Sequence, residues 1–189
     1  MPRFPSLPDN PHLSDVFRRF PAGMWQLCDL HDVKLRGDSP LSVAERELIA
    51  AYVSGLNACR FCFGAHSSIA EIHGMDPGLF EKLVESPTEA GVDRKLLPIL
   101  AYVKKLTESP SKLVDRDAEA VFAEGWSEQA LFDAVVVCAL FNFMNRIVEG
   151  CGVVPTAAMT GQLRAMMEQM KGDPDTYKSF ARMSGVPAS

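Results

Sequence analysis

The sequence contains no cluster of lysine and arginine residues and no long uninterrupted hydrophobic run. Its 19 basic and 24 acidic side chains give a net charge of -5, which argues against a phosphate-binding surface and therefore against nucleic acid as a partner. The uninterrupted apolar run in its most hydrophobic segment, 134–141, has eight residues, whereas a helix that spans a bilayer requires about 20. We therefore expect no membrane partner.

The N-terminus also lacks the apolar segment of a signal peptide. Prolines occupy four of its first eleven positions, and we expect residues 1–12 to form an extended arm. Without an export signal, an odd number of cysteines, five, is better explained by free thiols in a reducing compartment than by a disulfide framework. The sequence thus predicts a cytoplasmic protein in which Cys28, Cys138 and Cys151 are packing residues.

Residues 13–189 are expected to form a single domain. The chain is 47% hydrophobic and 23% charged, as is usual for a soluble globular protein, and it is long enough to enclose one substantial core. Apolar residues recur at helical spacing, and glycine and proline residues interrupt this pattern. Helices are expected within residues 13–37, 43–54, 59–73, 77–84, 93–108, 115–123, 127–149 and 156–170.

One stretch, from Glu47 to His66, contains most of the chemically reactive side chains. It starts in a helix that we expect to begin near Val43, because Ser42 followed by Glu45 is the pattern of a capping box. In that helix Glu47 shares a stripe with small side chains three, four and seven positions further on. Small neighbours leave space beside a carboxylate.

Two cysteines and a histidine follow on the next expected helix, after a turn at 55–58 in which Gly and Asn tolerate the left-handed conformation. Cys59, Cys62 and His66 are spaced i, i+3, i+7 and therefore share one face. One helical turn separates the two cysteine Cα atoms by roughly 5 to 6 Å, which is close enough for a disulfide. The start of a helix also lowers the pKa of a thiol, so this arrangement suits redox cycling.

A thiol that reduces a peroxide requires a base for its own proton and a donor for the departing oxygen, and Glu47 and His66 are the candidates for this relay. Together with the cysteines they form the pattern E-x11-C-x-x-C-x-x-x-H. The pattern resembles the alkyl hydroperoxidase D-like group of the carboxymuconolactone decarboxylase superfamily, especially its smaller peroxidase-related members. The segment 141–146, FNFMNR, is also similar to that group, so the resemblance covers residues 40–155.

The resemblance implies an all-helical fold, a homo-oligomer, and reduction of a hydroperoxide substrate by the cysteine pair. By position, Cys62 is the cysteine that attacks the peroxide and Cys59 the one that resolves the product as a disulfide, with Glu47 and His66 in the proton relay. Phe61 stands where the best-known members carry a second histidine. The resemblance further implies a dithiol electron donor, such as a lipoyl group or a thioredoxin-like protein, and no tightly held cofactor.

Other interpretations of the motif remain open at this point. All four motif residues are potential zinc ligands, although no second ligand pair follows the single C-x-x-C. The chain could also be a helical assembly protein with buried cysteines, or a superfamily member with other chemistry, although decarboxylase members generally lack the cysteine pair. Phe63 after Cys62 excludes the attachment of haem through a C-x-x-C-H motif.

Three later segments are assigned no chemistry. The helix that starts near residue 127 has almost no polar face, so we expect a buried core helix, either at the centre of the bundle or at a subunit interface, with a structural ion pair for Arg146 near its end. Met159, Met166 and Met170 form one stripe, which predicts a packing face that fills gaps. The polar tail, 172–189, is expected to be peripheral.

Overall fold

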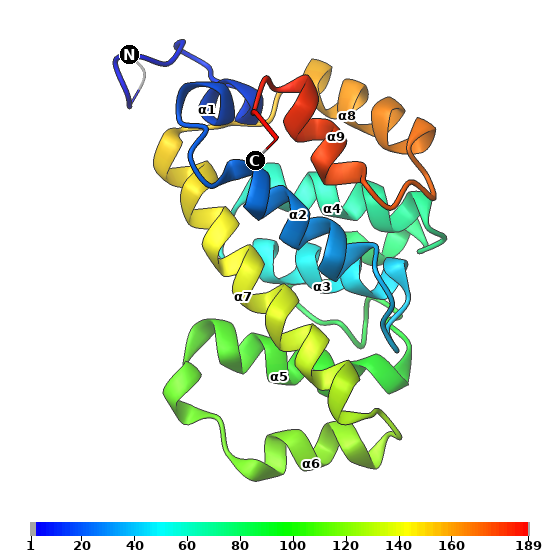
Figure 1. Cartoon of the computed structure of the whole chain (residues 1–189). Helices are drawn as coiled ribbons and strands as arrows, with labels where there is room; N and C mark the ends of the chain where they lie inside the picture. Colours follow the sequence, from blue (N-terminus) through cyan, green and yellow to red (C-terminus); the bar gives the residue numbers. More distant parts are fainter. Residues whose placement is uncertain (1–2, 189) are drawn as a thin grey trace.

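The structure, a computed structural model, describes residues 3–188 (Figure 1). Within this range it contains nine α-helices, three short 3-10 helices and no β-strand, so the all-helical fold is confirmed. The α-helices are α1 (Leu13–Arg19), α2 (Met24–Leu35), α3 (Val43–Leu56), α4 (Arg60–Ile72), α5 (Leu97–Glu108), α6 (Asp115–Ala123), α7 (Glu128–Cys151), α8 (Ala157–Gln169) and α9 (Thr176–Met183). The 3-10 helices are Pro77–Glu81, Arg94–Leu96 and Pro110–Lys112.

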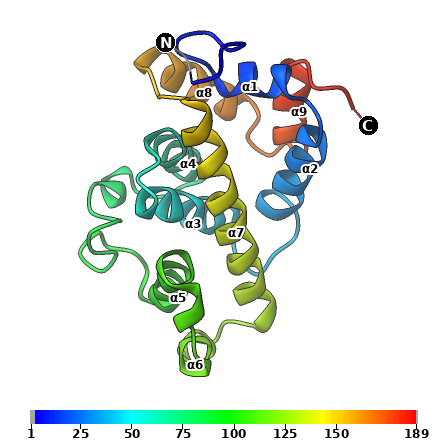
Figure 2. The same cartoon turned by 90° about the vertical axis from the view of Figure 1, so that its left-hand side faces the viewer.

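The helix pair α3 and α4 forms the centre of the fold. α3 packs most extensively against α4 and also against α7 and α5, and every residue from 47 to 54 is at most 2% exposed. The predicted capping box at its start is confirmed, because Ser42 Oγ accepts from the backbone N–H of Glu45 at 3.2 Å and the Glu45 carboxylate accepts from that of Ser42 at 2.6 Å. Figure 2 shows α7 running along this helix pair.

The turn between α3 and α4 differs from the prediction. Gly55 remains helical, and its lack of a side chain serves packing, since a Cβ atom there would lie 2.3 Å from Cγ2 of Val84. The left-handed residue is instead Ala58, with a φ of 54°. The backbone N–H of Cys59 closes the turn by donating to the carbonyl oxygen of Ser54 at 2.9 Å. This bond places Cys59 at the position that caps the start of α4.

The long helix α7 is less buried than its composition predicts. Phe132 and Phe143 are 56% and 48% exposed, so α7 is not buried on all sides within one chain, and the alternative of a subunit interface stays a prediction. Arg146 is also exposed, and it donates to the backbone and side-chain oxygens of Asn142 instead of forming the expected ion pair. Among the described helices α7 alone is long and apolar enough to cross a membrane, yet 56% of its most apolar window is buried inside the protein, as in a core helix.

The C-terminal residues are not peripheral, contrary to the prediction. α8 packs against α4 and α9 against α2, and Figure 2 shows both helices at the same end of the molecule as α1. The carboxylate of Asp32 on α2 accepts hydrogen bonds from the backbone N–H groups of Tyr177 and Lys178 at 2.7 and 2.9 Å. These bonds fix the start of α9 and bring Tyr177 into the interior.

Candidate active site

The structure brings the four residues of the predicted motif together. Glu47 lies on α3, Cys62 and His66 lie one turn apart on α4, and Cys59 precedes α4 as its N-cap residue. Nδ1 of His66 is 2.5 Å from Oε2 of Glu47. Cys59 and Cys62 are both buried free thiols, and each shifts the pKa of the other.

Glu47 is a fully buried carboxylate with three hydrogen-bond partners. Its Oε1 accepts from Arg36 at 2.5 Å and from the hydroxyl of Tyr177 at 3.2 Å, and its Oε2 accepts from His66. Burial alone would raise the pKa of Glu47, but the charges and hydrogen bonds of His66 and Arg36 outweigh it and lower the pKa to about 2. Glu47 is therefore ionised at neutral pH, which suits it to orient His66 rather than to carry a proton.

His66 has a fixed tautomer and a fixed ring orientation. A carboxylate only accepts hydrogen bonds, so Nδ1 of His66, which faces Glu47, carries a proton, and Nε2 is the atom that can gain or lose one. The ring stands edge-on against Phe141, with centroids 4.3 Å apart and an angle of 74° between the planes. Nε2 of His66 is therefore a candidate base, presented by the same helix as Cys62.

The pKa values of the two thiols are shifted in opposite directions. The pKa of Cys59 is lowered by the hydrogen bond from the Cys62 thiol and by the backbone N–H of Cys62, against burial and the nearby Glu149. The pKa of Cys62 is raised, because its proton is held in that hydrogen bond and the thiol is buried. A substrate could reach only the sulfur of Cys62, because Cys62 lines a cavity. Cys59 is 0% exposed and does not line the cavity.

Three asparagines form a polar network behind the cysteine pair. Asn145 is 2% exposed, and its side-chain amide donates to Oγ of Ser54 at 3.0 Å while its Oδ1 accepts from Asn57 at 3.0 Å. Asn57 also donates to Oδ1 of Asn142 at 3.1 Å. Asn145 also acts against the rise in the pKa of the Cys62 thiol. The network ties α7 to the turn that holds the cysteines.

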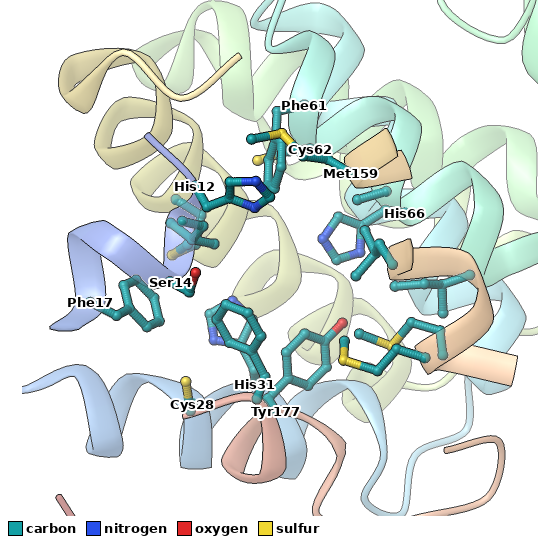
Figure 3. A pocket seen from close by; sticks show the side chains of 18 of the residues that line it. His12, Ser14, Phe17, Cys28, His31, Phe61, Cys62, His66, Met159 and Tyr177 are labelled. Carbon is teal, nitrogen blue, oxygen red and sulfur yellow. The ribbon is translucent and has the colours of Figure 1, made fainter. Parts of the chain in front are cut away.

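A largely apolar cavity of about 220 Å³ opens next to Cys62 and His66 (Figure 3). Helices α1, α2, α4, α7, α8 and α9 all contribute to its wall. The four methionines of the wall are Met144, Met159, Met166 and Met167. The prediction that the methionine stripe of α8 only fills gaps is therefore wrong for Met159 and Met166, whose side chains border open space.

The remaining three cysteines stand apart from the pair. Cys138 is 0% exposed and contacts the hydroxyl of Thr107 at 3.3 Å, and Cys151 is partly exposed at the end of α7. Cys28 lines the cavity, where burial, together with the charge of Asp32, raises its pKa to about 12. Cys28 therefore stays a protonated and weakly nucleophilic thiol.

The geometry gives no support to a zinc site. In residues 3–188, apart from the side chain at 158, no group of three or more His, Cys, Asp or Glu side chains is arranged to hold a metal ion. Nδ1 of His66 and both oxygens of Glu47 are already engaged in hydrogen bonds within the protein. The same four residues are instead arranged as a thiol pair beside a histidine–carboxylate pair.

Three residues of the site were not predicted from the sequence. Arg36 and Tyr177 hold the carboxylate of Glu47, and His31 lines the cavity away from Cys62 (Figure 3). A buried carboxylate requires a positive partner, and this rule could have pointed to Arg36, which lies 11 positions before Glu47. No sequence signal marks Tyr177, which lies 130 positions away.

Residues 21–93, which include the whole motif, match the model of the carboxymuconolactone decarboxylase family. The chain is also similar to the crystal structure of an uncharacterized peroxidase-related protein from Silicibacter sp. TM1040, with a TM-score of 0.73 and 26% identity over 80% of this chain and 79% of the other. A second crystal structure with the same fold is that of an uncharacterized peroxidase-related protein from Ralstonia eutropha JMP134, described as an alkylhydroperoxidase core. Its TM-score is 0.73, with 22% identity over 79% of this chain and 78% of the other. No curated protein matches the sequence.

Because Glu47 is ionised in the folded chain, we expect the protein to lose stability in acid. The pKa of Glu47 is about 2 in the folded chain, against 4.5 for the unperturbed side chain, so its contribution is complete above pH 4.5 and is lost as the pH falls toward 2. The loss is on the order of 3 kcal/mol. Urea unfolding at several pH values between about 6 and 3 measures it. The free energy of unfolding of Glu47→Gln should fall less steeply over this range, because glutamine does not titrate. An equal fall in wild type and variant would contradict the low pKa of Glu47.

Proposed function

We propose that this protein is a thiol-dependent hydroperoxide reductase in which Cys59 and Cys62 cycle between a dithiol and a disulfide. The observation that carries the proposal is a pair of free thiols, of which Cys62 lines an apolar cavity, beside a histidine oriented by an ionised carboxylate. The description of the Silicibacter relative as peroxidase-related supports it.

In the first step Nε2 of His66 accepts the proton of Cys62, and the thiolate attacks the terminal oxygen of the hydroperoxide. A sulfur–oxygen bond forms and the oxygen–oxygen bond breaks, which leaves Cys62 as a sulfenic acid. The departing alkoxide takes the proton from His66 and leaves as an alcohol. Glu47 remains ionised throughout, because it holds Nδ1 of His66 and stabilises the imidazolium that forms.

In the second step the thiolate of Cys59 attacks the sulfur of Cys62. The disulfide forms, the sulfur–oxygen bond breaks, and the departing hydroxide takes up the proton that Cys59 released, which gives water. Two thiols and one hydroperoxide have then given one disulfide, one alcohol and one water. The lowered pKa of Cys59 fits this second role, because it increases the thiolate fraction of Cys59, and the thiolate is the form that attacks the oxidised Cys62.

The completion of the cycle and the assembly state rest on the family resemblance. We propose a dithiol donor, such as a lipoyl group or a thioredoxin-like protein, that reduces the disulfide, and a cytoplasmic location that keeps such donors available. A homo-oligomer is likewise proposed. Phe132 and Phe143 support it, because they give α7 an exposed apolar face of the kind that a second copy would cover.

The direct test is a thiol count with intact mass on the reduced protein, before and after one equivalent of cumene hydroperoxide. We expect the loss of both thiols and of the mass of two hydrogen atoms, mapped by peptide analysis to a link between Cys59 and Cys62. An unchanged mass and thiol count would overturn the proposal. Zinc measured on the same sample tests the metal alternative, since one tightly bound zinc per chain would replace the redox assignment by a metal site.

A further inference from the structure

The cavity contains a second imidazole that the two steps above do not use. His31 on α2 is 5% exposed and lines the cavity together with Cys62 and His66 (Figure 3). Its ring is held between two aromatic neighbours, with its centroid 5.9 Å from that of Phe141 and 5.0 Å from that of Tyr177. The ring is therefore fixed in place rather than free to rotate.

The hydrogen bonding of His31 leaves one nitrogen available to a ligand. Nδ1 lies 2.7 Å from the carbonyl oxygen of Leu27, one turn earlier on α2. A carbonyl oxygen only accepts, so Nδ1 carries the proton, and Nε2, on the opposite side of the ring from this bond, is a bare acceptor. Within residues 3–188 no protein group is found to donate to Nε2.

His31 accepts at Nε2 without donating there. Burial lowers the pKa of His31 to about 4, and the hydrogen bond to Leu27 only partly offsets this effect. The ring is therefore neutral at neutral pH. The other polar side chains of the wall are less suited to this role. Tyr177 and His66 already bond to Glu47, and His12 and Gln162 lie at the exposed rim. The hydroxyl of Ser14 is a donor as well as an acceptor, whereas Nε2 of His31 only accepts.

An organic hydroperoxide fits this arrangement of one buried acceptor in an apolar cavity. Its terminal oxygen carries its only hydrogen-bond donor, and the same oxygen is the atom that Cys62 must reach. Its carbon group requires apolar surroundings, which the methionines of the wall supply. A buried O–H without an acceptor is unfavourable, so the cavity needs one such acceptor.

We propose that His31 is a substrate-binding residue whose Nε2 accepts the O–H of an apolar organic hydroperoxide and thereby turns its terminal oxygen toward Cys62. The inference rests on the proposed function and names the substrate class of the same site. His31 transfers no proton in the reaction, because the terminal oxygen keeps its hydrogen as it becomes the sulfenic acid. The carbon group of the substrate occupies the part of the cavity lined by Met159 and Met166.

Two substitutions of His31 separate its two nitrogens. In His31→Asn the side-chain amide can replace Nδ1 and keep the bond to Leu27, but nothing replaces Nε2. In His31→Gln the longer side chain places its amide oxygen near the position of Nε2. Asparagine is therefore the variant that lacks the acceptor, and glutamine is the matched control of similar polarity.

We expect His31→Asn to lower kcat/KM for cumene hydroperoxide about five- to tenfold, mainly through KM, while His31→Gln stays within about twofold of wild type. Oxidation of the pair by diamide, which carries no O–H group, reports on the thiols themselves and should be similar in all three proteins. Thermal unfolding checks that both variants are folded. If His31→Asn and His31→Gln have the same kcat/KM for cumene hydroperoxide, whether below or equal to that of wild type, the proposal is overturned.

Binding of cumyl alcohol to the disulfide form tests the same contact without turnover. This alcohol has the carbon group of cumene hydroperoxide and one O–H, and we expect His31→Asn to bind it about five- to tenfold more weakly than wild type or His31→Gln. Equal binding by all three proteins would overturn the role of His31. A wild type that binds the alcohol with this pattern but does not reduce the hydroperoxide would uphold the acceptor and overturn the proposed function instead.

Discussion

Cys62→Ser is expected to abolish hydroperoxide consumption, whereas Cys59→Ser is expected to react once and then stop. The difference follows from position, because the sulfur of Cys62 borders the cavity and that of Cys59 is enclosed behind it. Without Cys62 no thiolate meets the substrate. Without Cys59 the sulfenic acid on Cys62 has no partner with which to form a disulfide. Residual peroxide measured over time, with intact mass on the protein, distinguishes the two outcomes.

Cys151→Ser provides the matched control for this pair of variants. Cys151 is a partly exposed cysteine outside the cavity wall, so its loss should leave consumption close to wild type. Dimedone labelling should detect the sulfenic acid in Cys59→Ser and place it on residue 62. Equal consumption by wild type and Cys62→Ser would end the assignment. A sulfenic acid on Cys59 in the Cys62→Ser protein would reverse the two roles. It would mean that the lower pKa of Cys59, rather than the position of Cys62 on the cavity wall, determines which thiol attacks the peroxide.

Arg36→Met is expected to destabilise the protein by about 3 to 5 kcal/mol, the usual effect of leaving a buried charge without its partner. Arg36 bonds to Oε1 of Glu47, and both side chains are almost completely enclosed. The same substitution should raise the pKa of Glu47 and so weaken its hold on the proton of His66. We therefore expect slower hydroperoxide reduction as well as a lower midpoint in urea.

A double variant separates the loss of charge balance from the loss of packing. Arg36→Met combined with Glu47→Gln leaves no unpaired charge, so it should be more stable than Arg36→Met alone while reducing hydroperoxide no faster. Arg116→Met removes the same charge from an exposed position on α6, and it should change stability by less than about 0.5 kcal/mol. If the single variant at Arg36 proves as stable as the one at Arg116, the ion pair with Glu47 is not important for stability.

The motif could be predicted from the sequence because its geometry is local. The capping box of Ser42 and Glu45 fixes where α3 begins, and the spacing of Cys59, Cys62 and His66 fixes which side chains share a face of α4. Such relations depend only on the period of a helix. The same local pattern also supported the resemblance that gave the all-helical fold.

The partners of the motif could not be predicted in this way, because they depend on how separate helices pack. Tyr177 reaches Glu47 only because Asp32 fixes the start of α9. His31 belongs to α2, and nothing in its sequence surroundings distinguishes it from an ordinary buried histidine. The same limit applies to α7, since an apolar composition does not distinguish a face that is buried within the chain from one that is left exposed on its surface, as Phe132 is.

The methionines of the cavity wall also have a chemical consequence. A thioether reacts with peroxides to form a sulfoxide, which is polar and chiral, and only a dedicated reductase reverses the change. Met144, Met159, Met166 and Met167 border the space that a hydroperoxide would occupy, so each molecule that fails to react at the cysteine can damage the surface that bound it. The working lifetime of such a catalyst is then limited by its own substrate, and its survival under oxidative stress depends on the cell's capacity for methionine repair.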